Sequence, residues 1–570
     1  MNAFTKHKLY ETALDIYRQM QNCGLAPNTY TFVSALNASV SSPIHGVHEI
    51  HASIVEHGFM KEVIVCTSLM NIYSKKGDLH QAKLIFNDMR GKDAVSWNAM
   101  IASCTQNGSF DDALALFNTM KDHGFDPNHI TFVCALDACS SLGALQDGKE
   151  IHESIIHNGY MENIIIGNAL LDMYGKCGSL TDAKEVFSNM PKLDVISWST
   201  MISICVQNGY CEEGLCYFYK MKKEGIEPTS VTFLCVIDAC ASGKMLEEGE
   251  KIHAIIARSK YSEELSVLNA LVSMYGKCGS LLRAKQMFDQ IEHPNIVTWN
   301  AMISAYAQSG NNKKALDLFK ELQTVGIKPD EITFSCVLDV CASLRDLEEG
   351  RNVDKAITGD RYREDIMLGT ALVNMYGKCG DFHNAKMIFD QMPKRDVALW
   401  SAIVTACAND GRNEEALHLF HQIYINNLLP DPIAYVAALN SCSNACRSED
   451  GLRIHTELIF FGYEKELQVG TSLVDMYGKC GFLGSARYVF LLMAHRDVVT
   501  WNAMMAACAQ NGHGKEAISL FYKMEKDLVK PDGITFISLL SACNHMGMVE
   551  DGKRLFASMK MDYGITQCAE

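Results

Sequence analysis

The 570-residue chain repeats itself with a period of 101 residues. Its tryptophans, five of its prolines and the cysteine of the recurring string YGKCG all return at this spacing. These markers are Trp97, Trp198, Trp299, Trp400 and Trp501, then Pro127, Pro228, Pro329, Pro430 and Pro531, then Cys177, Cys278, Cys379 and Cys480. Such self-similarity predicts an array of small units, and it overrides the estimate of about four separate domains that length alone would give.

Each 101-residue block divides into units of 35, 35 and 31 residues, and each unit has the pattern of two helices. In the unit that opens at Ile296, apolar residues recur at helical spacing twice, and Ser309-Gly310 separates the two stripes. The stripes are Trp299, Met302, Ile303 and Tyr306, then Ala315, Leu318, Phe319 and Leu322. A single helical hairpin cannot bury such a stripe, whereas stacked hairpins share a continuous core. The sequence therefore predicts an all-α solenoid.

Composition limits the function classes. Lys and Arg number 51 and Asp and Glu 67, so the formal net charge is 51 − 67 = −16. This balance excludes a protein that coats nucleic acid by bulk positive charge. Hydrophobic residues make up 48% of the chain, which excludes intrinsic disorder.

The sequence contains no complete catalytic or metal-binding motif in a suitable structural context. Most of the 22 cysteines occupy repeated positions, which favours core packing in a reducing compartment, and no Cys-x-x-Cys spacing occurs. Gly512 to Ala517 matches a dinucleotide-binding glycine motif but falls in a turn between helices, where a strand should precede it. His455 and Glu457 match half of a deaminase zinc site, and the cysteine half is absent. We expect no enzyme activity, metal or cofactor in this chain.

The string from Val297 to Asp330, VTWNAMISAYAQSG through GIKPD, resembles a pentatricopeptide repeat. The alternation of 35, 35 and 31 residues is similar to the P, L and S units of the plant organellar subclass of that family. Tetratricopeptide repeats differ in keeping a uniform period of about 34 residues and a different first-helix signature. The resemblance implies a right-handed superhelical α-solenoid of helix-turn-helix repeats that binds single-stranded RNA at one base per repeat.

The same resemblance divides the chain into 17 units. They are a partial P unit at 1–28, an L unit at 29–62, an S unit at 63–93, P-L-S triplets at 94–194, 195–295, 296–396 and 397–497, a P unit at 498–532 and an L-like unit at 533–567, followed by a tail at 568–570.

In the family, the fifth and last residues of a unit read the base. This implies that uracil is read by Asn168/Asp194, Asn300/Asp330 and Asn502/Asp532, guanine by Thr67/Asp93, Thr370/Asp396 and Thr471/Asp497, a purine by Ser401/Asp431, and a pyrimidine by Asn98/Asn128 and Asn269/Asn295. Ser199/Thr229 departs from the family's pairs, so its base stays open. The L units place apolar residues at the fifth position, and these are expected to space the units: Val33, Val133, Leu234, Val436 and Ile537.

A second reading of these pairs is structural, because Asn and Asp are common helix-capping and turn residues. Capping alone explains poorly why the fifth residue is polar in the P and S units but apolar in the L units named above. A column of lysines at 101-residue spacing could meet RNA phosphates, although solvated surface lysine is the plain alternative. The column is Lys75, Lys176, Lys277, Lys378 and Lys479.

The end of the chain, from Asn544 to Val549 and from Met561 to Ile565, resembles the final L-type unit of plant organelle RNA-editing factors. In that family E motifs and often a deaminase domain follow, so we expect either a fragment of such a factor or a truncated one that needs a deaminase in trans. The predicted function is site recognition for cytidine-to-uridine editing or related processing of organellar RNA. The alternative is a helical scaffold for protein binding.

The resemblance places the protein in the mitochondrion, with the chloroplast as the alternative, and we expect a monomer. No transit peptide is visible before the first repeat. No apolar run reaches the 18 residues that a membrane span requires, so no membrane partner is expected.

Overall fold

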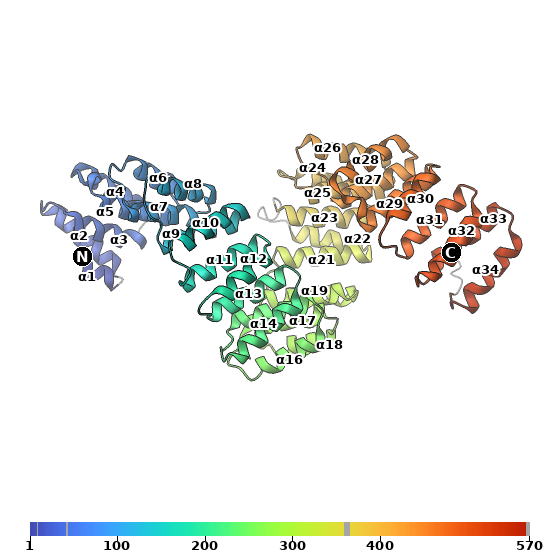
Figure 1. Cartoon of the computed structure of the whole chain (residues 1–570), viewed down its shortest axis with the longest axis horizontal. Coiled ribbons are helices and arrows are strands. Elements are labelled where there is room, and N and C mark those ends of the chain that lie inside the picture. The colour runs from blue at the N-terminus through green and yellow to red at the C-terminus, as the bar shows by residue number, and fades with distance from the viewer. Residues whose placement is uncertain (8, 42–43, 358–364, 566–570) are drawn as a thin grey trace. The chain divides into compact units, whose positions relative to one another are not determined.

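The computed structural model describes residues 1–7, 9–41, 44–357 and 365–565. The chain divides into two compact units, Met1–Met287 and Phe288–Glu570, and each is described by itself. Both are arrays of helical hairpins (Figure 1). In the described ranges there are helices and turns but no strand, so the prediction of an all-α solenoid is confirmed.

The helices are short and regular, most of them between 10 and 14 residues long. In the first compact unit they are α1 (Asn2–Lys6), α2 (Tyr10–Asn22), α3 (Thr29–Ala38), α4 (Ile44–Glu56), α5 (Val63–Lys75), α6 (Leu79–Asp88), α7 (Ala94–Gln106), α8 (Phe110–Asp122), α9 (His129–Leu142), α10 (Leu145–His157), α11 (Ile164–Lys176), α12 (Leu180–Asn189), α13 (Val195–Gln207), α14 (Cys211–Lys223), α15 (Ser230–Ser242), α16 (Leu246–Ile256) and α17 (Leu265–Lys277). The next helix, α18 (Leu281–Asp289), contains the boundary between Met287 and Phe288. Short 3-10 helices lie at Ser39–Ser41 and Phe59–Lys61.

The second compact unit continues the same alternation. Its helices are α19 (Ile296–Gln308), α20 (Asn312–Val325), α21 (Glu331–Leu344), α22 (Leu347–Ala356), α23 (Ile366–Lys378), α24 (Phe382–Gln391), α25 (Val397–Asn409), α26 (Asn413–Ile425), α27 (Pro432–Ala445), α28 (Ser448–Phe461), α29 (Leu467–Lys479), α30 (Leu483–Leu492), α31 (Val498–Gln510), α32 (Gly514–Lys526), α33 (Gly533–His545) and α34 (Val549–Met561). A 3-10 helix occupies Tyr463–Lys465.

The hairpins form two layers. First helices of successive hairpins pack on one another, as α5 does on α7 and α7 on α9. Each second helix packs on its own first helix and on the first helix of the next hairpin, as α8 does on α7 and α9. The first helices therefore make a continuous surface within each compact unit, and residues at one repeat position line up along it.

The turn inside a hairpin explains one sequence motif. Gly178, Gly310 and Gly512 adopt φ values of 74°, 75° and 76° between the two helices of their hairpins, a conformation that glycine adopts without strain. Gly512 thus joins α31 to α32 and does not follow a strand. The structure agrees with reading the glycine motif at this point as a turn.

The tryptophan period has a packing cause. Trp97 meets Phe86 of the preceding hairpin edge-to-face, with ring centroids 4.9 Å apart and an interplanar angle of 78°. The pair recurs with the period, and its other members are Phe187/Trp198, Phe288/Trp299, Phe389/Trp400 and Phe490/Trp501. Such contacts stabilise by about 0.5 to 1.5 kcal/mol beyond the area that they bury. Each tryptophan therefore joins two neighbouring hairpins.

Four histidines that share one repeat position, His51, His152, His253 and His455, each contact a tyrosine of the next hairpin. His455 Nδ1 lies 2.7 Å from the Tyr477 hydroxyl of the next hairpin, so this side chain contributes to the packing of neighbouring hairpins. Burial lowers the pKa of His455 and so favours the neutral ring. The sister histidines His51, His152 and His253 bond their tyrosines in the same way.

The cysteines behave as small apolar residues. Every cysteine in the described part of the chain is a free thiol, and Cys139, Cys240 and Cys341 are fully buried. Burial raises the pKa of these three thiols to about 12, which suppresses the reactive thiolate. Across the described ranges, no group of three or more His, Cys, Asp or Glu side chains is placed to hold a metal ion. None of the helices described above combines the length and apolar character that crossing a bilayer demands.

Candidate functional site

The last residue of each P- and S-type unit caps the first helix of the next unit. Asp330 has extended backbone geometry, and its carboxylate accepts a 2.8 Å hydrogen bond from the Thr333 backbone N–H in the first turn of α21. The capping residues at these joints are Asn28, Asp93, Asn128, Asp194, Thr229, Asn295, Asp330, Asp396, Asp431, Asp497 and Asp532. The helix-capping role is therefore present at each of these positions.

The Asn-containing pairs are bonded directly to each other. Asn300, on α19, donates from Nδ2 to Oδ1 of Asp330 at 2.9 Å. Asn502, on α31, donates to Asp532 at the same distance, and Asn168 donates to Asp194 at 3.3 Å. Since an amide nitrogen carries two hydrogens, one N–H of each Asn remains for another partner.

A third residue closes this network. Thr333 donates from its hydroxyl to Oδ1 of Asn300 at 2.6 Å, and Thr535 does the same to Asn502 at 2.7 Å. The hydroxyl lies at the third place of the following unit, a position that sequence reasoning did not single out. Its signal was present, because Ser or Thr stands at this place in most of the units. The network fixes which way each Asn amide points.

The hydroxyl-containing pairs differ among themselves. Ser401 lies 2.7 Å from the Asp431 carboxylate and donates to it, while Thr370 donates to its own helix at the Ile366 carbonyl, 2.8 Å away. Thr471 also bonds its own helix and reaches the Thr500 hydroxyl at 2.8 Å. The Thr67 hydroxyl is buried and has no hydrogen-bond partner in the described structure. At Thr370 and Thr67 the structure does not bring the fifth residue onto the last.

Two further pairs are joined through the third residue. The Ser199 hydroxyl lies 2.7 Å from that of Thr232, which lies 3.1 Å from that of Thr229. Asn98 accepts a short hydrogen bond from Thr131, whose hydroxyl also lies 3.1 Å from Oδ1 of Asn128.

The pair Asn269 and Asn295 is divided between the two compact units, so each residue is described within its own unit. Asn269 is a buried residue of α17, and Asn295 caps α19.

The carboxylates of three pairs are held in the ionised form. Burial by itself would raise the pKa of Asp330, but hydrogen bonds from Thr333 and Asn300 outweigh it and bring that pKa below the usual value of 3.8. The pKa values of Asp194 and Asp532 are lowered by the same balance. These groups are acceptors at neutral pH.

The joints after L-type units are built differently. Val133, Leu234 and Val436 are half-buried at the fifth place, and they have no group that could join the last residue by a hydrogen bond. Ile537 is exposed at this place, and Val33 is half-buried. Ser335 departs from the apolar rule in the unit 331–365. The residues that follow also vary, since Asn163 and Asp365 cap the next helix with their side chains whereas Glu62, Glu264 and Glu466 do not.

A cavity of about 420 Å³ opens beside one pair. Ser199 and Thr229 line it together with Lys176, the lysine-column residue of the preceding unit. Ile196 and Val231, at the second place of two successive units, line the same cavity and are 57% and 58% exposed. The cavity thus offers hydroxyl groups, exposed aliphatic walls and a cation in one place.

Exposed aliphatic side chains recur at the second place of most units and were not predicted from the sequence. Examples are Val95, Ile165, Val297, Ile332 and Val499. Their signal was an apolar residue in the first helical turn that falls outside the buried stripe.

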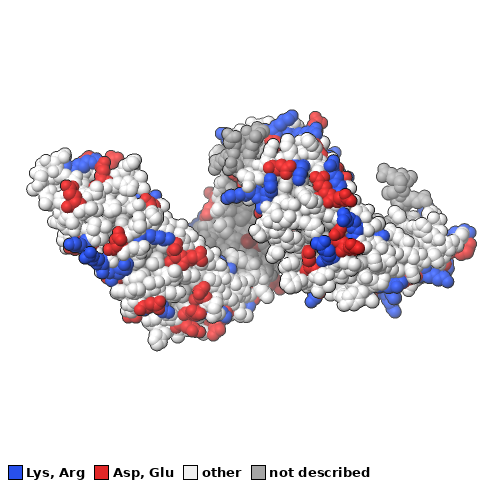
Figure 2. All heavy atoms as spheres, turned by 90° about the horizontal axis from the view of Figure 1, so that it is seen from above, with Lys and Arg blue, Asp and Glu red and all other residues white. Residues whose placement is uncertain are grey.

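The lysine column lies at the ends of S-unit first helices, and its members are exposed. Lys176 and Lys479 form 2.9 Å ion pairs with Asp172 and Asp475 of their own helices. Lys75, Lys277 and Lys378 form no ion pair with any described residue. On the face shown in Figure 2, basic and acidic groups lie interspersed, in keeping with the net charge of −16.

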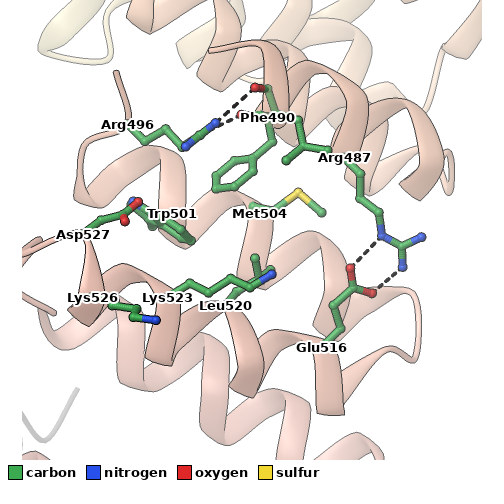
Figure 3. A pocket seen from close by; sticks show the side chains of 11 residues that line it. Arg487, Phe490, Arg496, Trp501, Met504, Glu516, Leu520, Lys523, Lys526 and Asp527 are labelled. Atoms are coloured by element: carbon green, nitrogen blue, oxygen red, sulfur yellow. Dashed lines mark hydrogen bonds and ion pairs between the residues drawn. The ribbon is translucent and has the colours of Figure 1, made fainter. Parts of the chain in front are cut away.

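Another cavity, of about 300 Å³, lies between α30 and α32 (Figure 3). Trp501 and Phe490 form part of its apolar wall, and Lys523 and Lys526 line it from α32. Arg487 on the opposite side is paired with Glu516 at 2.7 Å. Its lining contains no fifth or last residue of a unit, so this cavity is separate from the polar pairs.

Two models of known protein families match the sequence. A family model described as PPR repeat family matches residues 92–141, 193–242, 294–343 and 496–545. A model described as PPR repeat matches residues 1–25, 64–93, 168–195, 266–294, 370–397, 398–426 and 534–563.

Relatives in Arabidopsis thaliana are pentatricopeptide repeat-containing proteins. A chloroplastic one is 32% identical over 538 residues, covering 94% of this chain and 66% of the relative. A second is 31% identical over 571 residues, covering 100% of this chain and 65% of the relative. A mitochondrial one is 31% identical over 545 residues, covering 94% of this chain and 79% of the relative. The chain thus spans just under two thirds of the length of the first two.

Solved structures agree on the fold. The crystal structure of the pentatricopeptide repeat protein PPR10 from maize matches with a TM-score of 0.57 and 19% identity, over 100% of this chain and 88% of that one. The same protein in complex with an 18-nucleotide psaJ RNA element matches with a TM-score of 0.58 and 17% identity, over 97% and 87%. At this identity the likeness concerns the fold.

Proposed function

The chain belongs to the pentatricopeptide repeat family, and from that membership we propose that it binds single-stranded RNA in a sequence-specific way along the layer of first helices. The observation that carries the proposal is the cavity at Ser199 and Thr229. Hydroxyl groups suited to a base edge, aliphatic walls suited to the faces of a base ring, and a lysine suited to a phosphate lie together there. An RNA-bound structure exists for the maize protein, which shares the fold.

We propose that each P- or S-type unit reads one base through its fifth and last residues. The Asn pairs favour this reading because the Asp carboxylate and the Thr hydroxyl fix the amide while one Asn N–H stays available. Capping and reading are then two roles of one side chain. The unit division at 28, 62, 93 and onward belongs to the same proposal.

The lysine column supplies phosphate contacts in this proposal. Replacing Lys277, which forms no ion pair with a described residue, with Ala should weaken binding to every RNA alike and reduce the slope of log affinity against log salt by about 0.7, the value expected for one phosphate contact on a single strand. A loss confined to some sequences would contradict the phosphate role. Lys176 should contribute less, because Asp172 partly neutralises it.

In the cell, we propose that the protein selects sites for cytidine-to-uridine editing or related processing of organellar RNA, with a deaminase acting in trans or from a longer form of the chain. Both mitochondrial and chloroplastic relatives support an organelle, and the mitochondrion is our assignment. Editing at the bound transcript should fall when the gene is silenced, which RNA sequencing measures.

A gel-shift experiment tests the binding proposal. The reader pairs predict the target 5′-G Y n U r n Y U n G R n G U n-3′ from the unit 63–93 onward, where Y is a pyrimidine, R a purine and n any base, and r marks the place of Ser199/Thr229, whose base stays open. At physiological salt, an oligonucleotide of this pattern should bind at least tenfold more tightly than a scrambled one. Equal binding would refute the reader assignment. Absence of any RNA binding, together with capture of protein partners, would favour a protein scaffold.

A further inference from the structure

Thr229 also lines a second cavity, whose lining does not include Ser199. It has a volume of about 610 Å³ and lies between the end of α14 and the segment that follows α16. Lys222, in the last turn of α14, lines it together with Arg258, Lys260 and Tyr261. Thr229 lines both this cavity and the one that contains Ser199, so it stands at the boundary between them.

Three of the four charged side chains that line this cavity are cationic. Lys222, Arg258 and Lys260 form no ion pair or hydrogen bond through their side chains to a described residue, and the one acidic residue in the lining is Glu227. Lys260 lies over the Tyr261 ring at 5.2 Å. The Tyr261 ring is itself held by Phe233, with centroids 6.0 Å apart. Three cations that form no ion pair, beside an aromatic ring that packs on Phe233, match the chemistry of a nucleotide.

At this place the sequence departs from three other L-type units, and the unit 331–365 also has a basic residue, Arg361, at the equivalent position. In the L-type units 29–62, 129–163 and 432–466 a turn glycine follows the second helix, as at Gly159 and Gly462 with φ of 71° and 75°. Here Lys260 occupies that position, and α16 ends at Ile256, two residues earlier than α10 does relative to the repeat. The altered segment places Arg258 and Lys260 against the cavity.

Thr229 is the third departure. At every other P- and S-type joint the last residue is Asp or Asn, whereas a neutral hydroxyl stands here. A carboxylate at the boundary would repel a phosphate lodged among the three cations. The neutral residue and the added cations therefore favour the same occupant.

We propose that this cavity, defined by Lys222, Thr229, Arg258, Lys260 and Tyr261, is an additional nucleotide site that holds a phosphate and the adjoining base of the bound RNA strand. The proposal rests on the proposed RNA binding. The phosphate lies against Lys222, Arg258 and Lys260, and the base lies on Tyr261. The strand is thereby anchored at the unit whose pair the family pattern leaves unassigned.

Salt-dependent binding of the full chain to the 15-nucleotide target tests the site. The double variant Arg258→Ala/Lys260→Ala should lose three- to thirtyfold in affinity at physiological salt, and its slope of log affinity against log salt should fall by about 0.7 to 1.4. The variant Arg258→Lys/Lys260→Arg keeps both charges and should restore the slope. Ultraviolet crosslinking followed by mass spectrometry should place the RNA on Tyr261.

The variant Lys523→Ala/Lys526→Ala is the matched control. Like the test variant it removes two positive charges, but from the cavity of Figure 3, whose lining contains no fifth or last residue of a unit. Its slope should equal that of the wild type. Equal changes in both double variants would show a bulk charge effect and overturn the site, as would a wild-type slope in Arg258→Ala/Lys260→Ala.

The outcomes separate the two proposals. A wild-type chain that binds no RNA refutes the proposed function, whereas a wild type that binds and a double variant that binds identically refute only this site. Saturation by free uridine monophosphate with unchanged RNA affinity would assign the cavity to a free nucleotide, and loss of an acidic protein with RNA binding intact would assign it to a protein. Both results overturn the proposal. Circular dichroism confirms that each variant is folded.

Discussion

The P- and S-type units and the L-type units share one fold, yet they differ at the joint to the next unit. At the joint after the unit 296–330, Asp330 caps α21 and also holds the amide of Asn300. At the joint after the unit 432–466, Glu466 makes no side-chain cap and Val436 has no group to offer. Stacking of the hairpins does not require the polar network, because both kinds of joint occur in the same array. The network is then free to serve recognition.

The largest expected effect comes from exchanging one kind of reader for another. Asn300→Thr should shift preference at its base from uracil toward guanine by about 1 to 3 kcal/mol, the range measured for specific base contacts. The reason is that a hydroxyl replaces the amide donor and leaves Asp330 free of its Asn partner. Competition binding with targets that differ at this base alone measures the shift. The reciprocal exchange, Thr370→Asn, should reverse it at its own base.

The next effect concerns the stability of the joint itself. Asp330→Ala removes the cap of α21 and should cost about 0.5 to 2 kcal/mol in the free energy of local opening. Glu466→Ala removes no cap bond and should stay within about 0.5 kcal/mol of the wild type. Hydrogen exchange of the first-turn amides in α21 and α29 reports each joint separately. Equal losses of protection in the two variants would show that Asp330 and Glu466 stabilise the next helix alike, and would contradict the difference between the two kinds of joint.

Much of this contrast could be predicted from the sequence. The 101-residue period and the stripe through Trp299 are sufficient for a solenoid, since hairpin packing follows from local periodicity. The pairs such as Asn300/Asp330 could be named, but capping and reading could not be separated. The sequence also could not show that one carboxylate, Asp330, both caps α21 and accepts a hydrogen bond from the Asn300 amide, because this depends on distances between neighbouring hairpins.

What sequence reasoning missed lies between units. The Thr333 hydroxyl closes the Asn300 network only because α21 packs on α19. The ion pair of Lys176 with Asp172, which weakens one member of the lysine column, depends on side-chain rotamers. The cavity of about 610 Å³ beside Thr229 lies next to the early end of α16. Hydrophobic periodicity does not locate a helix end to within two residues, so the sequence could not predict this cavity.

A smaller effect should appear with pH. The pKa of Asp330 is lowered below its usual 3.8, because hydrogen bonds to the carboxylate outweigh its burial. The folded state therefore favours the ionised form, and its stabilisation is complete above 3.8 and is lost as the pH falls through the lowered value. The difference in urea midpoint between wild type and Asp330→Asn should shrink as the pH drops below 4. A difference that grew in acid would contradict the sign of the shift.

The smallest effect is expected at an L-type unit. Val133 has no hydrogen-bonding group, so Val133→Ala removes only part of an aliphatic contact and should change RNA affinity by less than about 0.5 kcal/mol. The change should be the same whichever base stands opposite this unit, because neither side chain distinguishes base edges. Binding to four targets that differ only at that base measures it. If the wild type already prefers one base there by tenfold, the L-type units read sequence, and the joint network is not what separates a reading unit from a spacing one.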